Sequence, residues 1–357
     1  MRLQVLTRYS RMGASSRLRM MQFAPILAEH GIETCFNPLL DNRYLRGLYG
    51  GTLCFGAAFR SYARRLRDLI RSRNADVIWL EKEALPWVPA LVEHALMPKG
   101  VPVVTDYDDA LFHRYDQHHS VLVRHLLGHK IDKVMARSAL VMAGNRYLAD
   151  RALVAGAPWV ETVPTVVDIT RYQPKPLEAR QGEVVIGWIG SPSTWNNDLK
   201  PIVPLLTAIA HDSKARLHVI GSHALPDLHP LVNIIPWVEE EEVARIQAMD
   251  IGIMPLTDTP WARGKCGYKL IQYMACGLPV VASPIGVNCE IVEHGVNGFL
   301  ASTPAEWQEA LKTLIANPSL RVEMGLAGRR KVESQYSLQV WGPRVAELFY
   351  RVGKPKA

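Results

Sequence analysis

The sequence predicts an α/β protein made of two doubly wound parallel-sheet domains. Short apolar runs of strand length alternate with segments of helix length through the first half of the chain. A second alternation of the same kind begins at Val184. The chain of 357 residues is also longer than one ordinary hydrophobic core supports, so two domains are expected.

The first half begins with a strand predicted at residues 3–7. Ser15 or Ser16 is expected to cap the N-terminus of a helix that runs to about Gly31. An arginine-rich helix is predicted over 60–73, and Asn145 is expected to begin another helix. Further strands are expected at 32–36, 76–80, 101–105 and 139–143. We expect this domain to span residues 1–170.

The second half follows a stretch rich in Pro, Lys and Glu, residues 173–181, which is typical of a linker. Strands are predicted at 184–190, 216–220, 250–254 and 279–283, with helices at 201–211, 305–316 and 338–351. We expect the second domain to span 171–337 and the final helix to pack back on the first domain.

Composition narrows the class of protein. Hydrophobic residues make up 48% of the chain and charged residues 21%, as in ordinary globular proteins. The five cysteines are scattered without metal-ligand spacing, which indicates free thiols in a reducing compartment. The apolar runs are too short for a signal peptide or for the ~18 residues that would cross a bilayer. We therefore expect a cytoplasmic protein.

Positive charge gathers in the first 73 residues, which hold thirteen arginines, no lysine and four acids, a net charge of +9. No helix-turn-helix, zinc-finger or RNA-binding signature accompanies it, so nucleic acid is not an expected partner. Arg64, Arg67 and Arg71 are three and four residues apart and so share a helix face. This basic face predicts peripheral binding to an anionic membrane surface. A solvated basic face is the alternative.

The stretch from Lys265 to Glu290 is the most informative part of the sequence. An apolar helix seed ends at Gly277, and a buried strand and a glycine turn follow. This order places a helix start and a strand end at one crevice, where open parallel sheets bind ligands. Lys265 and Lys269 are four residues apart and are expected on one helix face at its N-terminal end. The pattern predicts a phosphate or nucleotide site.

A second anion-binding loop is predicted after the strand that ends at Gly190. The glycine allows backbone N–H groups to approach a phosphate, Ser191 and Ser193 add donors, and Lys200 adds charge. An ordinary turn would explain the same residues. Two such loops in one α/β domain would together neutralise a diphosphate leaving group without a metal ion.

These motifs carry a family resemblance. The run from Met274 to Ser283, with Glu290 and the Gly295–Phe299 segment beyond it, resembles the C-terminal signature of retaining family 4 glycosyltransferases of the GT-B fold. That fold has two Rossmann-like domains facing across a cleft. The family carries two glutamates that hold the ribose and the donor sugar, and here Gly264 and Gln272 stand at those positions. A subgroup with a modified motif has Gly-Lys-x-x-x-Lys, as this chain does from Gly264 to Lys269.

The resemblance also assigns residues in the first half. Asp108 and Asp109 fall on the family's His-Asp pair, which faces the donor sugar, and are the expected catalytic residues. Gly13, Ser15, Ser16 and Arg17 fall on its glycine-rich loop beside the donor phosphate and the acceptor, and Arg19 adds a second cation for an anionic acceptor. Two alternatives stay open for the aspartates at 106, 108 and 109: helix capping, and a metal-binding Asp-x-Asp motif.

The resemblance implies transfer of a sugar from a nucleotide-diphosphate donor to a glycan or lipid-linked acceptor, as in cell-surface polysaccharide synthesis. The donor binds the second domain, the acceptor binds the first, and neither a metal nor another cofactor is required. A sugar-nucleotide epimerase on the same fold and a non-catalytic binding protein are the alternatives. The replacement of both glutamates favours the non-catalytic binding protein.

Overall fold

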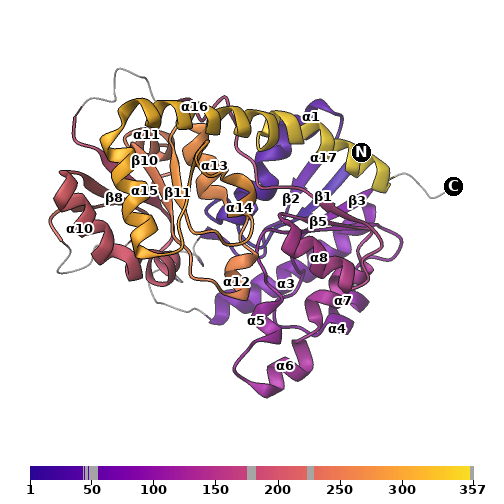
Figure 1. The fold of residues 1–357 in the computed structure, drawn as a ribbon. Helices are drawn as coiled ribbons and strands as arrows, with labels where there is room; N and C mark the ends of the chain where they lie inside the picture. The colour runs from indigo at the N-terminus through magenta and orange to yellow at the C-terminus, as the bar shows by residue number, and fades with distance from the viewer. Residues whose placement is uncertain (43, 45–46, 48–54, 175–181, 223–228, 354–357) are drawn as a thin grey trace. The chain divides into compact units, whose positions relative to one another are not determined.

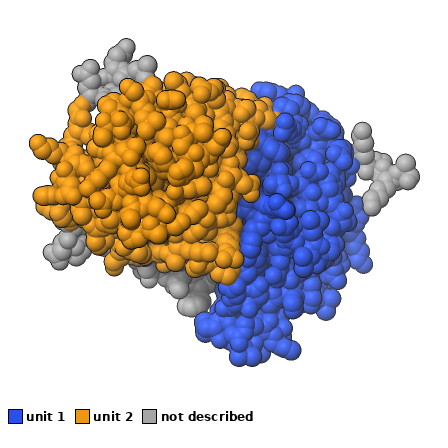
Figure 2. Space-filling model, viewed as in Figure 1, with its two compact units in different colours: residues 1–165, 264–266, 341–357 blue, residues 166–263, 267–340 orange. Residues whose placement is uncertain are grey.

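The computed structural model describes residues 1–42, 44, 47, 55–174, 182–222 and 229–353 (Figure 1). The chain forms two compact units, which Figure 2 shows in separate colours. Unit 1 comprises residues 1–165, 264–266 and 341–357, and unit 2 comprises residues 166–263 and 267–340. Residues 175–181 of the predicted linker lie outside the described residues.

Unit 1 contains a six-stranded, fully parallel sheet in the order β2-β1-β3-β4-β5-β6. The strands are β1 (Arg2–Leu6), β2 (Glu33–Phe36), β3 (Val77–Glu81), β4 (Val103–Tyr107), β5 (Leu140–Ala143) and β6 (Val160–Thr162). The helices are η1 (Ser16–Met20), η2 (Met21–Phe23), α1 (Ala24–Glu29), α3 (Phe55–Arg71), η3 (Ser72–Asn74), α4 (Ala90–Leu96), α5 (His113–Asp116), α6 (Val121–Leu127), α7 (Lys130–Arg137), α8 (Arg146–Val154) and α17 (Leu338–Gly353), of which α17 joins this unit from Trp341.

The central strands of unit 1 are buried because helices cover both faces of a parallel sheet. Every residue of β3 is buried, and the register pairs Leu80 with Thr105 and Glu81 with Asp106. The loops that follow β3 and β4 therefore start side by side at one edge of the sheet. This edge holds the charged residues of the candidate site.

Unit 2 contains a second six-stranded parallel sheet, in the order β12-β11-β10-β7-β8-β9. The strands are β7 (Val185–Ile189), β8 (Arg216–Ile220), β9 (Val232–Ile235), β10 (Ile251–Met254), β11 (Val280–Ala282) and β12 (Gly298–Leu300). The helices are α9 (Pro192–Thr194), η5 (Trp195–Leu199), η6 (Lys200–Ile202), α10 (Val203–Ser213), α11 (Glu242–Gln247), α12 (Pro260–Arg263), α13 (Tyr268–Ala275), α14 (Asn288–Ile291), α15 (Pro304–Ala316) and α16 (Pro318–Gln335).

The predicted fold class, two doubly wound parallel-sheet units, is confirmed. The structure divides between Thr165 and Val166, a few residues before the expected boundary, and it adds residues 264–266 to unit 1. Within the described ranges, no helix combines the length and the apolar character that a membrane span needs.

Two local predictions are wrong. Neither Ser15 nor Ser16 caps a helix, because the chain continues into η1 without a side-chain cap and Ser16 bonds elsewhere. Lys265 is not on a helix with Lys269, because α13 begins at Tyr268 after Gly267 in the left-handed region (φ 65°). Arg64, Arg67 and Arg71 lie on one side of α3 as predicted, but Arg64 is half-buried and donates to the carbonyl oxygen of Leu39 at 2.9 Å, so it adds little to an exposed basic surface.

Candidate active site

A lysine immediately after β3 organises the charged edge of unit 1. Lys82 has a positive φ of 65°, which is uncommon for a residue with a side chain. Two hydrogen bonds hold this conformation: the Lys82 N–H donates to the Asp106 carbonyl oxygen at 3.1 Å, and the Tyr107 hydroxyl donates to the Lys82 carbonyl oxygen at 2.7 Å. The backbone is thus fixed, and the side chain starts from a set position.

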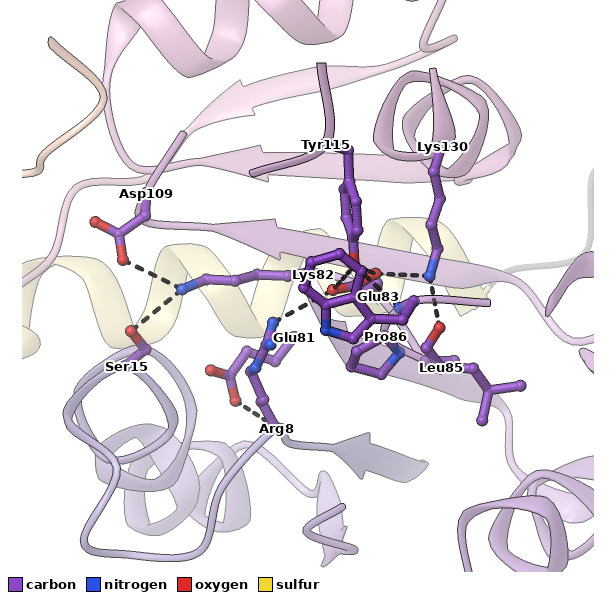
Figure 3. A network of polar contacts seen from close by, with 12 residues as sticks. Arg8, Ser15, Glu81, Lys82, Glu83, Leu85, Pro86, Asp109, Tyr115 and Lys130 are labelled. Carbon is purple, nitrogen blue, oxygen red and sulfur yellow. Dashed lines mark hydrogen bonds and ion pairs between the residues drawn. The ribbon is translucent and has the colours of Figure 1, made fainter. Parts of the chain in front are cut away.

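The Lys82 ammonium group lies among oxygen atoms from two other loops (Figure 3). Its Nζ is 2.7 Å from Asp108 Oδ1, and it is 3.4 Å both from Asp109 Oδ2 and from the hydroxyl of Ser15. Burial alone would lower the pKa of Lys82, but the two carboxylates outweigh burial and raise it. Lys82 is therefore a permanent cation that draws the loops after β1 and β4 together.

The two aspartates have different surroundings. Asp108 forms the shorter ion pair and its side chain is 14% exposed, whereas the side chain of Asp109 is 32% exposed. Burial favours the neutral form of each, but Lys82 outweighs burial at Asp108 and lowers its pKa. The pKa of Asp109 is raised by burial and by the charge of Asp108, against the opposing effect of Lys82 and Lys265. Asp109 is therefore the carboxyl group that a bound molecule can reach.

Two glutamates flank Lys82 and anchor it in the unit (Figure 3). Glu81 accepts hydrogen bonds from the backbone N–H of Arg8 at 2.7 Å and from the Ser16 hydroxyl at 2.6 Å. Glu83 is buried and contacts the guanidinium of Arg8, the hydroxyl of Tyr115 and the ammonium group of Lys130. Charges buried this deeply are tolerated only when they are paired, so this network is the rigid support of the site.

Asp106 is held by a buried arginine. Arg19 donates from Nε to one oxygen of Asp106 at 2.8 Å and from Nη2 to the other at 3.2 Å. The guanidinium predicted to bind an anionic acceptor is therefore occupied by an internal carboxylate. In the ranges that the structure describes, no group of three or more His, Cys, Asp or Glu side chains is arranged to hold a metal ion.

The predicted glycine loop lies beside Lys82. Ser15 contacts Lys82 and Ser16 bonds Glu81, while Arg17 donates to the carbonyl oxygen of Arg11 at 3.0 Å. Gly13 is needed because a Cβ there would lie 2.4 Å from Cβ of Tyr9. The structure thus joins the loop to the aspartates, and contact with a donor phosphate stays a prediction.

The segment 264–266 also belongs to this part of unit 1. A Cβ on Gly264 would lie 2.5 Å from Cβ of Ala110 and 2.7 Å from its backbone nitrogen, so no side chain fits there. The Cys266 thiol donates to the Asp108 carbonyl oxygen at 3.2 Å, and the Lys265 carbonyl oxygen accepts from Asn145 at 2.9 Å. This packing requires glycine at position 264, whichever residue the sequence pattern leads one to expect there.

Unit 2 brings Lys269 close to the loop at Gly190. Lys269 Nζ lies 5.3 Å from the ring centroid of Trp188, a cation–π distance. A Cβ on Gly190 would lie 2.3 Å from the same indole ring. Trp188 therefore connects the two predicted anion-binding elements, and Gly190 has its own packing reason to be glycine.

The other predicted donor-binding residues are placed differently. Ser191 caps α9 through a capping box with Thr194, and its hydroxyl is 2.9 Å from that of Ser193. Lys200 and Glu290 are exposed, and Gln272 is buried with its amide donating to the Tyr172 hydroxyl at 2.9 Å. The amide nitrogen of Gln272 is thus committed to the core. The roles of all these residues at a donor stay predictions.

Sequence reasoning missed Lys82. The signal was present: Glu81, Lys82 and Glu83 form a charged triplet directly after the apolar run 77–80. Three consecutive charges at the end of a central strand cannot all face solvent, because neighbouring strands cover them. The same argument singled out the aspartates after β4.

Comparison with known proteins agrees with this architecture. Anabaena HepE in complex with UDP-glucose superimposes with a TM-score of 0.72 at 17% identity, over 98% of this chain and 100% of that one. The fold is GT-B. Residues 183–317, all but three of them in unit 2, match the family described as Glycosyl transferases group 1.

Curated relatives match over limited segments. Alpha-1,3/1,6-mannosyltransferase ALG2 of Homo sapiens is 42% identical over 81 residues, covering 22% of this chain and 18% of that protein. Amylovoran biosynthesis glycosyltransferase AmsK of Erwinia amylovora is 31% identical over 136 residues, covering 35% and 32%. The first relatives compared are thus matched over less than two thirds of their own lengths.

Proposed function

We propose that this protein is a glycosyltransferase that moves a sugar from a nucleotide-diphosphate donor to a glycan or lipid-linked acceptor. The observation that carries the proposal is the coincidence of two findings in unit 2. The Glycosyl transferases group 1 match covers residues 183–317, and the same stretch holds Gly190 and Lys269 around Trp188. The GT-B fold and the named activities of the relatives support it.

The residues divide into two groups under this proposal. Lys269 and Lys200 in unit 2, with Lys265, supply positive charge to the leaving diphosphate. The backbone N–H groups predicted to bind phosphate are occupied, because Gly190 donates to the carbonyl oxygen of Ile220 at 3.0 Å and Ser191 donates to the Thr194 hydroxyl at 2.9 Å. The hydroxyl groups of Ser191 and Ser193 supply the donors of this loop instead. Asp109 in unit 1 accepts hydrogen bonds from sugar hydroxyls. Lys82 and Asp108 are positioning residues that hold Asp109 in place.

The proposed chemistry is retention at the anomeric carbon. The glycosidic bond to the donor phosphate breaks, the acceptor oxygen bonds to the same face of that carbon, and the leaving phosphate takes the acceptor proton. Such a reaction depends on positioning and on neutralisation of the developing charge, so a strong protein base is not required. We place the enzyme in the cytoplasm, in polysaccharide or glycan synthesis.

A non-catalytic, nucleotide-binding protein is the second candidate. It is favoured by Gly264, where no side chain fits, and by Gln272, whose amide is bonded in the core. Both candidates bind a nucleoside diphosphate, but only the enzyme releases one from a nucleotide sugar in an acceptor-dependent manner. Release of free nucleoside diphosphate therefore separates them.

Calorimetric titration with UDP and GDP tests the shared step. We expect one of them to bind, and Lys269→Ala to weaken binding roughly tenfold to a hundredfold, the scale of a charge-assisted hydrogen bond. Lys312→Ala on α15 is the matched control, since its partner is Asp212 at 3.7 Å, and it should leave binding unchanged. Absence of binding by the wild-type protein to either nucleotide would refute the proposal.

A further inference from the structure

Helix α3 exposes an apolar stripe along one side. Phe59, Leu66 and Ile70 are seven and four residues apart, so they lie on one side of the helix. Their exposed fractions are 78%, 39% and 62%. Exposed Ala63 lies on the same side. Aligned apolar side chains of this size on a surface indicate a site of interaction.

The neighbouring helix α4 adds to the stripe. Val92 and Leu96 are four residues apart and exposed, and Leu91 is exposed beside them. A groove with a volume of about 680 Å³ runs between the two helices. Its lining combines apolar side chains, among them Leu66, Ile70 and Leu96, with the two cations Arg73 and Lys99.

The charges of this face have one sign. Arg60, Arg67 and Arg71 are exposed on α3, along a line adjacent to the apolar stripe. Each of the two helices contains one carboxylate, Asp68 and Glu93, and both are buried. Among the described residues, the side chains of Arg73 and Lys99 form no hydrogen bond or ion pair. An anionic partner would therefore meet unopposed positive charge.

We infer that α3 and α4 form a docking face for a bilayer that contains anionic phospholipid, with a lipid phosphate between Arg73 and Lys99. Leu66, Ile70 and Leu96 enter the acyl boundary, as the apolar residues of interfacial amphipathic helices do. The arginines of α3 meet the surrounding head groups. The inference rests on the proposed function in one respect: it gives a lipid-linked acceptor as the reason for docking.

The same observations disfavour a second copy of this chain as the occupant. A two-fold interface places one patch against itself, so the arginine lines of the two copies would approach each other. Like charges brought together in this way oppose association. A bilayer that carries anionic head groups satisfies the arginines and covers the apolar stripe at once.

The exposed apolar stripe also changes the effect that salt is expected to have on vesicle binding. A purely electrostatic surface would release vesicles at high ionic strength, because the Debye length falls to ~3 Å at 1 M salt. Apolar residues that enter the bilayer retain binding under these conditions. We therefore expect weaker but measurable binding at high salt, in contrast to the full salt reversal that three arginines alone would predict.

Co-sedimentation of the full chain with vesicles tests this inference. Wild-type protein should pellet with phosphatidylcholine vesicles that contain phosphatidylglycerol and stay in solution with phosphatidylcholine alone. Arg73→Gln and Lys99→Gln should each weaken binding about fivefold, as expected for about 1 kcal/mol per charge. Leu66→Ser with Ile70→Ser should remove the binding that survives high salt.

Controls come from helix α8, which also exposes a basic and an apolar residue in unit 1. Arg146→Gln and Leu153→Ser there should leave vesicle binding unchanged. The inference would be overturned if the wild-type protein did not pellet with phosphatidylglycerol vesicles at low salt. It would also be overturned if the α8 variants lost as much vesicle binding as the variants on the docking face. A dimer in solution that Ile70→Glu converts to a monomer, without vesicle binding, would assign the face to self-association instead. Nucleotide titration of the same samples tests the proposed function separately.

Discussion

At the scale of single residues, Lys82 is the one with the widest influence on the candidate site. Its ammonium group contacts the loops after β1 and β4, and its left-handed backbone is fixed by two hydrogen bonds. Strained residues held by their surroundings are typical of functional sites. The sequence indicated the aspartates, but the cation between them became visible only when the register of β3 and β4 was known.

Substitution of Lys82 should change the pH dependence of activity. The Lys82 charge lowers the pKa of Asp108 and Asp109, so its loss in Lys82→Met should raise both. If ionised Asp109 binds the sugar, the acid limb of the kcat/KM profile should move to higher pH. Lys82→Arg keeps the positive charge, so its acid limb should lie at the same pH as that of the wild-type enzyme. An unchanged limb in Lys82→Met, in protein that is folded by circular dichroism, would remove Lys82 from the site.

Gly264 gives a second prediction at this scale. Gly264→Glu would introduce the glutamate that the resemblance leads one to expect at this position, but its Cβ would lie 2.7 Å from the backbone nitrogen of Ala110. We expect a loss of about 1–3 kcal/mol in the free energy of unfolding, and no gain in activity. Gly56→Glu on α3 is the control, because a Cβ there has no atom within 4 Å. Denaturant unfolding that shows equal stability for both variants would contradict this account.

At the scale of elements, the sequence predicted the buried strands better than the helix starts. Apolar runs such as 77–80 and 251–254 have one interpretation in a parallel sheet, because both faces are covered. Helix starts depend on side-chain partners far away in the sequence. Ser16 bonds Glu81 and so cannot cap a helix, and Gly267 delays the start of α13. No local pattern contains that information.

The predicted helix start at Asn145 is confirmed and can be tested as an element. Its Oδ1 accepts from the Leu148 N–H at 3.0 Å, and its Nδ2 donates to the Lys265 carbonyl oxygen at 2.9 Å. Asn145→Ala should lower the free energy of unfolding by more than about 1 kcal/mol. Loss of the cap alone accounts for about 1 kcal/mol, and loss of the bond to Lys265 adds to it. Asn145→Asp keeps the cap and loses only the second bond, so it should fall between wild type and Asn145→Ala. Chemical denaturation measures all three.

At the scale of the whole molecule, the two sheets carry different parts of the proposed machinery. Unit 1 holds the Lys82 network, and unit 2 holds Trp188 with Gly190 and Lys269. The sequence predicted this division because the two alternations of strand and helix are separate. It did not predict that residues 264–266 belong to unit 1, since their packing depends on contacts with Ala110 and with the carbonyl oxygen of Asp108, which lie far away in the sequence.

The charge distribution of the molecule leads to a prediction about metal ions. A diphosphate leaving group needs positive charge, which either a divalent cation or protein side chains supply. The carboxylates that would bind a cation already have partners: Asp106 is held by Arg19, and Asp108 and Asp109 share Lys82. Under the proposed function, the lysines at 200, 265 and 269 supply the positive charge that neutralises the diphosphate.

We therefore expect acceptor-dependent release of nucleoside diphosphate to continue at an unchanged rate in EDTA. Adding Mg²⁺ or Mn²⁺ to chelated enzyme should have no effect, because no step depends on a cation. Lys269→Ala should lose activity in both conditions. If chelation abolishes turnover and Mg²⁺ restores it, at least one aspartate must leave its partner to bind the metal. The ion pairs of Lys82 would then describe a resting arrangement, and the assignment of Asp109 to the sugar would be wrong.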